Sequence, residues 1–272
     1  MDIKKISLDP SAITWRLSLM AALLVATNIG MQAYRLFAHQ EHVRFMPLIS
    51  LDAEHNLPSL FSTILLLSAS ALLTLVALLE SERKGPDKWK WGILATGFLL
   101  MGLDETLSLH ERMIEPLRSL FGGQHHHLGI FYFAWVVPGI ALVAALGVFF
   151  LPFLFRLPRR TAIAFVISGA IYVGGALGVE LVEGWWREGH GHRNLTYHLL
   201  VSLEEGMEMV GAIAFIHALM DHIARYYGEV RIGFGHAGAP ALGAVDPVVE
   251  MDESHASNPF GASVPATPLL RD

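Results

Sequence analysis

Acidic side chains lie at the ends of three hydrophobic stretches, where a chain of this composition would rarely place charge. Residues 97–113, GFLLMGLDETLSLHERM, pass directly from an apolar run into acidic residues and a histidine. The stretches 174–186 and 197–211 contain the motifs ELVE and EEGME. The acids of the three stretches are Asp104, Glu105, Glu111, Glu180, Glu183, Glu204, Glu205 and Glu208. Because a charged side chain at the bilayer centre costs ~2.5–3.5 kcal/mol, acids at membrane depth indicate a functional site.

These acids must be neutralised or solvated, since the only cations nearby are Arg112, Arg187 and Arg193 at the ends of the stretches. Protons or a metal ion can neutralise them, and water can solvate them in a cavity open to the outside. A metal ion neutralises several acids at once, and carboxylates with one or two imidazoles suit iron, manganese or zinc. A structural network of mutual hydrogen bonds is the competing explanation.

Helical spacing sorts the acids by face. In residues 91–111, Asp104, Ser108 and Glu111 are spaced i, i+4, i+7 and form one stripe, with Glu105 beside it, while His110 points away from the stripe and is expected to be a packing histidine.

The other two stretches offer similar faces. Glu180 and Glu183 share a face of their helix, Glu204 and Glu208 are i and i+4, and His198 with Glu205 lies on the adjoining arc. We therefore predict that Asp104, Glu180, Glu204, Glu208 and His198 are metal ligands. Glu205 or Glu111 is predicted to be the general base or to support the ligands. The layout is analogous to di-iron carboxylate bundles, but no Glu-x-x-His occurs in any of these helices.

The elements that position these residues are predicted to be membrane helices. The chain has 272 residues, of which 53% are hydrophobic and 16% charged, against about 25% charged in soluble domains. Six stretches are long enough to cross a ~30 Å hydrocarbon core. They are residues 14–36, 58–79, 91–111, 128–155, 161–183 and 197–224. The fold class is thus an all-α, polytopic bundle of about six transmembrane helices. Gly174 and Gly178 form a Gly-x-x-x-Gly unit that allows close helix packing.

The distribution of Lys and Arg predicts the orientation. The N-terminal segment and the loops near residues 83–90 and 156–160 are basic, whereas the loops on the other side contain no Lys. We therefore expect a multi-pass protein of the plasma (inner) membrane with both termini cytoplasmic and the acids on the extracytoplasmic side. Residues 1–228 are the transmembrane domain, and residues 229–272, rich in Gly, Ala and Pro, are predicted to be a disordered cytoplasmic tail.

The remaining features carry less chemistry. A net charge of −6 without a basic stripe excludes a nucleic-acid partner, and the absence of cysteine excludes disulfides and thiolate ligands. The histidine clusters HQEH, GGQHHHLG and GHGH are read as polar turns. Glu111, Glu183 and Arg187 at helix ends can meet headgroups and water without any function.

Three classes of function remain open. The first is a metal-dependent membrane enzyme acting on a lipid or another amphiphile, since the acids lie at the depth of headgroups and upper acyl chains. The second is a proton- or cation-coupled transporter. The third is a non-catalytic structural or assembly subunit. Membrane lipid is the expected partner in the first class.

Overall fold

The computed structural model describes residues 9–39, 44–120, 127–228 and 230. Every regular element in this part of the chain is a helix, which agrees with the all-α prediction. The predicted tail, residues 229–272, lies outside the described residues except for Val230, as do parts of HQEH and GGQHHHLG.

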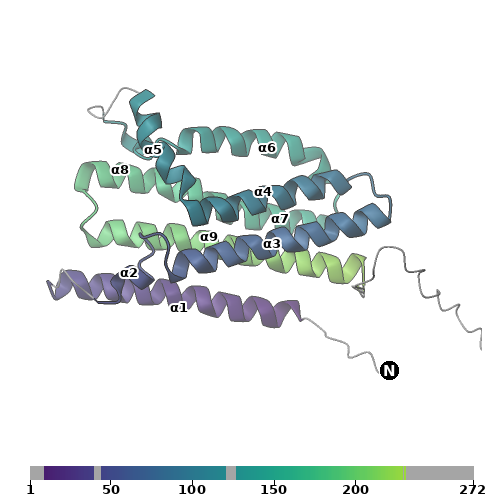
Figure 1. Ribbon diagram of the computed structural model, residues 1–272, viewed down its shortest axis with the longest axis horizontal. Coiled ribbons are helices and arrows are strands. Elements are labelled where there is room, and N and C mark those ends of the chain that lie inside the picture. The colour runs from purple at the N-terminus through teal and green to yellow at the C-terminus, as the bar shows by residue number, and fades with distance from the viewer. Residues whose placement is uncertain (1–8, 40–43, 121–126, 229, 231–272) are drawn as a thin grey trace, which may run out of the picture. The chain divides into compact units, whose positions relative to one another are not determined.

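Six long helical rods lie side by side in the described part of the chain (Figure 1). Two of them, the third and the fifth, are made of more than one element. The elements are α1 (Pro10–Phe37), α2 (Met46–Ile49), α3 (Leu57–Glu82), α4 (Lys88–Leu107), α5 (Leu109–Leu120), the short 3-10 turn η1 (Gly129–Phe131), α6 (Val136–Arg156), α7 (Arg159–Val173), the π-helical η2 (Gly174–Val179), α8 (Glu180–His190) and α9 (Leu195–Tyr226).

Among the described residues, four helices are long and apolar enough to cross a membrane: α1, α3, α6 and the continuous rod Arg159–His190. The pair α4 and α5 is a fifth candidate if it is counted as one bent span. The helix α9 is not among them. The structure thus supports a multi-pass membrane protein with four or five candidate spans.

The long helices begin at residues that satisfy their free N–H groups. The Asp9 side chain accepts a hydrogen bond from Ser11 N, and Pro10 follows at the first helical position. Asn56 forms a capping box with Ser59 at the start of α3. The Asn194 side chain accepts from Tyr197 N at the start of α9. These caps fix where α3 and α9 begin, and hence the depth at which the acids of α9 lie.

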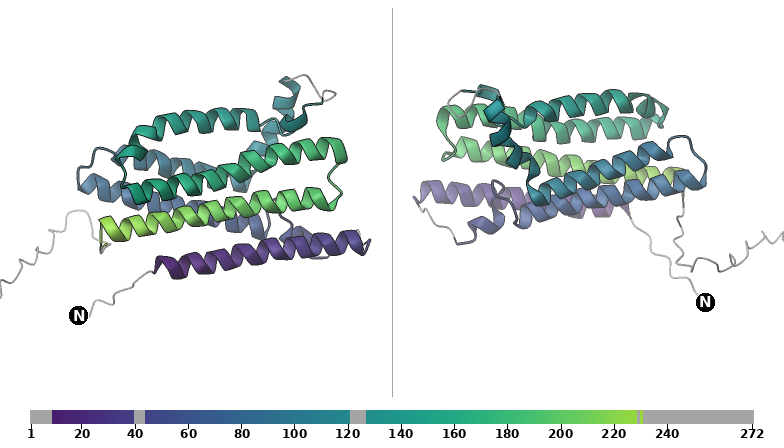
Figure 2. Two further views of the ribbon diagram at one scale, coloured as in Figure 1. Left: turned by 180° about the vertical axis from the view of Figure 1, so that it is seen from behind. Right: turned by 45° about the horizontal axis from the view of Figure 1, so that its top comes forward.

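The helix α9 is the centre of the bundle. It packs against α1, α3, α7 and α8, and Figure 2 shows it between α1 and the rod of α7 and α8. Met209, Ile213 and Leu219 are almost fully buried within this packing. At Gly211 the helices approach so closely that an added Cβ would lie 2.7 Å from the backbone nitrogen of Tyr172 on α7. Three of the acids therefore belong to the most enclosed helix.

The third rod is broken, contrary to the prediction of one helix over residues 91–111. Ser108 has the left-handed backbone conformation, with φ at 49°, and α5 leaves α4 at a bend of 79°. The left-handed region is costly for a residue with a side chain, and it ends an α-helix. The i, i+4, i+7 stripe of Asp104, Ser108 and Glu111 therefore does not exist, because its members are not on one continuous helix.

The fifth rod contains the π-helical turn η2 just before Glu180. Such a turn holds an extra residue, so it rotates every later side chain about the helix axis. Gly175, rather than Gly178, is consequently the glycine pressed against α9: its Cβ would lie 2.8 Å from the Glu204 carbonyl oxygen. Gly178 has open space around it, so the predicted Gly-x-x-x-Gly contact is wrong in its second glycine, whereas Gly174 does contact Met207.

The end of the bundle far from the acids of α8 and the first half of α9 is rich in basic residues, and ion pairs connect its helices. Arg156 donates two hydrogen bonds to the Asp87 carboxylate, which joins the α6–α7 turn to the α3–α4 turn. Arg160 pairs with Asp221 of α9 at 3.2 Å. The start of α1 and the end of α9 lie at this same end in Figure 1. An even number of passes through the bundle follows from that placement.

Candidate functional site

The acids of α8 and α9 face one another. The carboxyl groups of Glu183 and Glu204 lie close enough together for each to affect the charge of the other. Glu183 is only 5% exposed, and its Oε2 atom is buried without a hydrogen-bond partner among the described residues. A hydrogen bond between two carboxyl groups requires a proton, because two carboxylates repel each other. The pair can therefore hold one proton between two helices.

Two aromatic residues lie beside the neighbouring acids Glu180 and Glu208. Trp135, just before α6, donates its indole N–H to Glu180 Oε1 at 2.6 Å. Tyr172 of α7 lies close enough to Glu208 for its hydroxyl to affect the charge of that acid. Each of these acids thus has an uncharged polar group of the protein beside it.

Asp104 and His110 form an ion pair across the break between α4 and α5. Asp104 Oδ2 lies 2.7 Å from His110 Nδ1, and Asp104 Oδ1 accepts from the His110 backbone N–H at 3.0 Å. His110 also lies against the Trp135 ring, with centroids 5.0 Å apart. The expectation that His110 points away from the acids is wrong, because the left-handed turn at Ser108 carries it back over Asp104.

A loop that the sequence analysis left out adds two more acids. Asp52 and Glu54 lie between α2 and α3, and the Glu54 carboxyl is close enough to Glu105, Glu205 and Glu208 to affect their charge. Its Oε2 atom is buried, and no described residue forms a hydrogen bond with it. The sequence feature that could have identified these two acids is their position directly before Asn56, the N-cap of α3.

The hydroxyl of Tyr197 links this loop to α8. Tyr197 is 1% exposed and donates to Asp52 Oδ1 at 3.1 Å, while Arg187 Nη1 donates to the same hydroxyl at 3.2 Å. The Glu183 carboxyl also lies close enough to Tyr197 to affect its charge. A connected series of polar groups thus runs from the loop to the Glu183–Glu204 pair. We call the acids of this region the acidic site: Glu54, Glu105, Glu180, Glu183, Glu204, Glu205 and Glu208.

Two predicted site residues lie elsewhere. His198 is buried, but its Nε2 atom is 3.1 Å from Arg35 Nη2 on α1, and no acid is among its hydrogen-bond partners in the described part of the chain. This cationic neighbour makes His198 a poor metal ligand. Glu111 is exposed on α5, outside the α8–α9 contact. Of the five predicted ligands, the structure brings together Glu180, Glu204 and Glu208 in one region, with Asp104 beside them through His110.

Within the described residues, no three His, Asp or Glu side chains are arranged so that they could hold a metal ion. Glu180 instead accepts a hydrogen bond from Trp135, and Asp104 is paired with His110. A metal would require the Glu183 and Glu204 carboxylates to turn toward the ion. The donor set is nevertheless suitable for iron, manganese or zinc in its chemistry.

Burial raises the pKa of Glu54 above its ordinary value of 4.5, and the nearby Glu111 carboxylate raises it further. A carboxyl whose pKa is raised on folding favours the folded state at low pH, and this contribution is lost as pH rises from 4.5 through the folded-state pKa. Glu54→Gln should therefore make the protein more stable at neutral pH, with a gain that shrinks as the pH is lowered towards 4.5. Thermal unfolding in detergent at a series of pH values measures this gain.

The matched control is Glu115→Gln on the exposed surface of α5, which should leave the midpoint unchanged. A loss of stability in Glu54→Gln at neutral pH would show that the Glu54 charge is needed in the folded state.

Comparison with known proteins identifies the family. A family described as "Domain of unknown function (DUF8692)" matches residues 16–223, and the chain belongs to this family. Neither a curated protein nor a solved structure matches the chain. The matched range contains the whole acidic site.

Proposed function

Since membership of this family names no activity, the acidic site has to supply the function, and we propose that the protein is a proton-coupled membrane transporter. The observation that carries this proposal is the Glu183–Glu204 pair, in which two buried carboxyls on different helices lie close enough to affect each other's charge and so to share a proton. In a low-dielectric setting such a pair takes up one proton more readily than it carries two charges. A change in its protonation alters the attraction between α8 and α9.

The breaks in the helices support the same proposal. Transporters often place ion sites where membrane helices are discontinuous. Here the break at Ser108 and the π-helical turn Gly174–Val179 both adjoin the acids. Irregular backbone of this kind can change conformation at a lower cost than a regular helix. Protonation of the acids would then favour one of two arrangements of the broken rods.

The path for protons begins at the loop between α2 and α3. Asp52, Tyr197 and Arg187 form the outer part of the polar series, and the Glu183–Glu204 pair forms the inner part. Carboxyl and hydroxyl groups can pass protons along such a series. In this proposal the protein has six spans in the plasma (inner) membrane, both termini are cytoplasmic, and the acidic site opens to the extracytoplasmic side.

The proposed topology has its own test. The basic residues lie at the end of the bundle where α1 begins and α9 ends, so this end is expected to be cytoplasmic. A reporter fused after Gly228 should be active only on the cytoplasmic side, and one inserted at Gly191, in the α8–α9 turn, only on the opposite side. Finding both reporters on one side would refute the six-span arrangement.

The second candidate is a metal-dependent membrane enzyme acting on a lipid or another amphiphile. The buried Oε2 atoms of Glu54 and Glu183 have no hydrogen-bond partner in the described part of the chain, and they favour this candidate because they could add two oxygen ligands to the predicted set. Iron, manganese or zinc would bind Glu180, Glu204 and Glu208, with Glu205 or Glu111 as general base, and would supply an activated oxygen species or a Lewis acid.

Proteoliposomes containing metal-depleted native protein and a pH-sensitive dye test the proposal. Under a negative inside potential, they should acidify faster than empty liposomes, and this rate should be unaffected by added iron, manganese or zinc. Near-stoichiometric metal in the purified protein, with no proton flux, would support the enzyme. If the purified protein contains no metal and the proteoliposomes show no proton flux, the remaining class of function is the structural or assembly subunit.

A further inference from the structure

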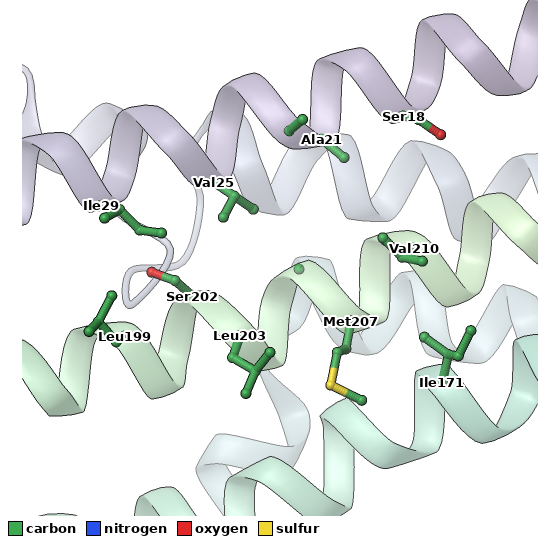
Figure 3. A pocket seen from close by; sticks show the side chains of 12 residues that line it. Ser18, Ala21, Val25, Ile29, Ile171, Leu199, Ser202, Leu203, Met207 and Val210 are labelled. Atoms are coloured by element: carbon green, nitrogen blue, oxygen red, sulfur yellow. The ribbon is translucent and has the colours of Figure 1, made fainter.

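Asn28 lies in the contact between α1 and α9. It is only 2% exposed, although it is a polar residue in the apolar helix α1. Its amide nitrogen donates to the Ser202 hydroxyl of α9 at 3.0 Å. Figure 3 shows Ser202 on the side of α9 that faces α1, near Ile29. A hydrogen bond thus joins α1 to α9 two residues before Glu204 of the acidic site.

The same amide also reaches the loop between α2 and α3. The Asn28 Oδ1 atom accepts a hydrogen bond from the Leu51 backbone N–H at 3.2 Å, and this bond is buried. Asp52 follows Leu51 directly, and Glu54 of the acidic site lies three residues after Leu51. Within the described residues, Asn28 makes the only side-chain hydrogen bond from α1 to this loop. It therefore bridges α9 to the segment that carries Asp52 and Glu54.

The hydrogen bonds around Asn28 fit only one orientation of its amide group. A backbone N–H can only donate, so the Leu51 N–H requires the amide oxygen on its side. The amide nitrogen is then left for Ser202, whose hydroxyl has to accept. This hydroxyl is able to accept because it donates its own proton to the His198 carbonyl oxygen at 2.7 Å. Each of the three bonds thus determines the direction of the next, and together they hold the loop in one arrangement.

The other polar contacts of the loop do not replace this bridge. The Asn56 side chain donates to two carbonyl oxygens within the loop, both at 2.6 Å, so it shapes the loop from inside. Tyr197 donates to Asp52 from the first turn of α9. Asn28 attaches the loop further along α9, at Ser202, and it does so from a third helix.

We propose that Asn28 is a positioning residue, which holds the loop between α2 and α3 against α9 so that Glu54 stays beside the acids of that helix. The Glu54 carboxyl is close enough to those of Glu205 and Glu208 to affect their charge. The helix α1 itself contains no acid, so its contribution to the acidic site is this bridge. The inference goes beyond the proposed function, because it holds whether the site binds protons or a metal ion.

Hydrogen–deuterium exchange of the full-length protein in detergent tests the proposal. Asn28→Leu replaces the amide with an apolar side chain of similar size, so the Leu51 N–H loses its acceptor. The backbone amides of residues 50–55 should then exchange about tenfold faster, since a buried donor without a partner favours the open loop, whereas α3 and α9 should keep their native exchange. Gln32→Leu is the matched control and should leave the loop unchanged. Gln32 is the other buried amide of α1, and it forms no hydrogen bond to the loop among the described residues.

Two results of this experiment would overturn the proposal. Native exchange of the loop in Asn28→Leu would show that other contacts hold it in place. An equal rise of exchange in the loop, α3 and α9 would show that Asn28 only stabilises the bundle. Ser202→Ala cuts the bridge at α9 without any change in α1, and it replaces Asn28→Leu if that variant does not fold.

A distance measurement reports on position alone. The chain contains no cysteine, so one spin label can be attached through a cysteine at His55 in the loop and another at Leu203 on α9, both of which are exposed. The distance distribution should be narrow in this background and in its Gln32→Leu variant, and shifted or broader in Asn28→Leu. An unchanged distribution in Asn28→Leu would contradict the proposal. Neither measurement requires proton transport, so failure of this proposal is distinct from failure of the proposed function.

Discussion

Glu204→Gln is expected to slow potential-driven proton uptake by proteoliposomes about tenfold or more, a change of about 1.4 kcal/mol in the barrier, while the protein stays folded. Glutamine can donate a hydrogen bond to Glu183, so the α8–α9 contact remains. It cannot gain or lose a proton, so the shared carboxyl pair no longer exists. The initial rate of dye response, normalised to protein incorporated, measures the effect.

The matched control for this variant is Glu82→Gln at the far end of α3, an exposed acid at the basic end of the bundle. Its proton uptake should equal that of the native protein. If Glu204→Gln retains the native rate, the carboxyl pair is not part of a proton path. If Glu204→Gln loses bound metal in proportion to an enzymatic activity, the metal-dependent enzyme replaces the transporter.

Gly211→Ala is expected to have the largest effect on stability, about 3 kcal/mol of destabilisation, because overpacking forces the backbone apart. The added Cβ would lie 2.7 Å from Tyr172 N and 2.8 Å from Tyr172 Cα, and neither backbone atom can rotate away. Tyr172 also lies close to Glu208, so the shift disturbs the acidic site. Thermal unfolding in detergent measures the loss.

Gly206→Ala provides the comparison on the same helix. Its Cβ would be 3.6 Å from Val25 Cγ2, an ordinary contact, so its stability should be native or slightly higher, since Ala favours a helix over Gly. Equal stability of Gly206→Ala and Gly211→Ala would mean that α7 and α9 are not packed as closely as described.

The positions of the helices could be predicted from the sequence because their signal is local. Long apolar stretches give the rods, and Asp9, Asn56 and Asn194 mark three of their starts. The prediction of an unbroken helix over residues 91–111 failed at Ser108, since neither Pro nor Gly marks the break. The Asp104 side chain bonds His110 across the break, and hydrophobic periodicity does not detect such a polar contact or a single left-handed residue.

The candidate site could be predicted only in part, because helical spacing is a local signal and contacts between helices are not. The acids of α8 and α9 could be assigned to facing surfaces from helical spacing, and Glu180, Glu204 and Glu208 do lie in one region. Trp135, Tyr172 and Tyr197 were missed because aromatic residues in a membrane chain usually serve packing or the interface. His198 was assigned to the acids by its arc on α9, but that arc faces Arg35 of α1, a contact between residues 163 positions apart.

Infrared spectroscopy of the metal-depleted native protein tests the central claim, that protons neutralise the acidic site. At neutral pH the spectrum should contain the C=O stretching band of a protonated carboxyl group, shifted in heavy water, and this band should weaken in Glu204→Gln but not in Glu82→Gln. A native spectrum with carboxylate bands alone, together with near-stoichiometric metal before depletion, would contradict the claim.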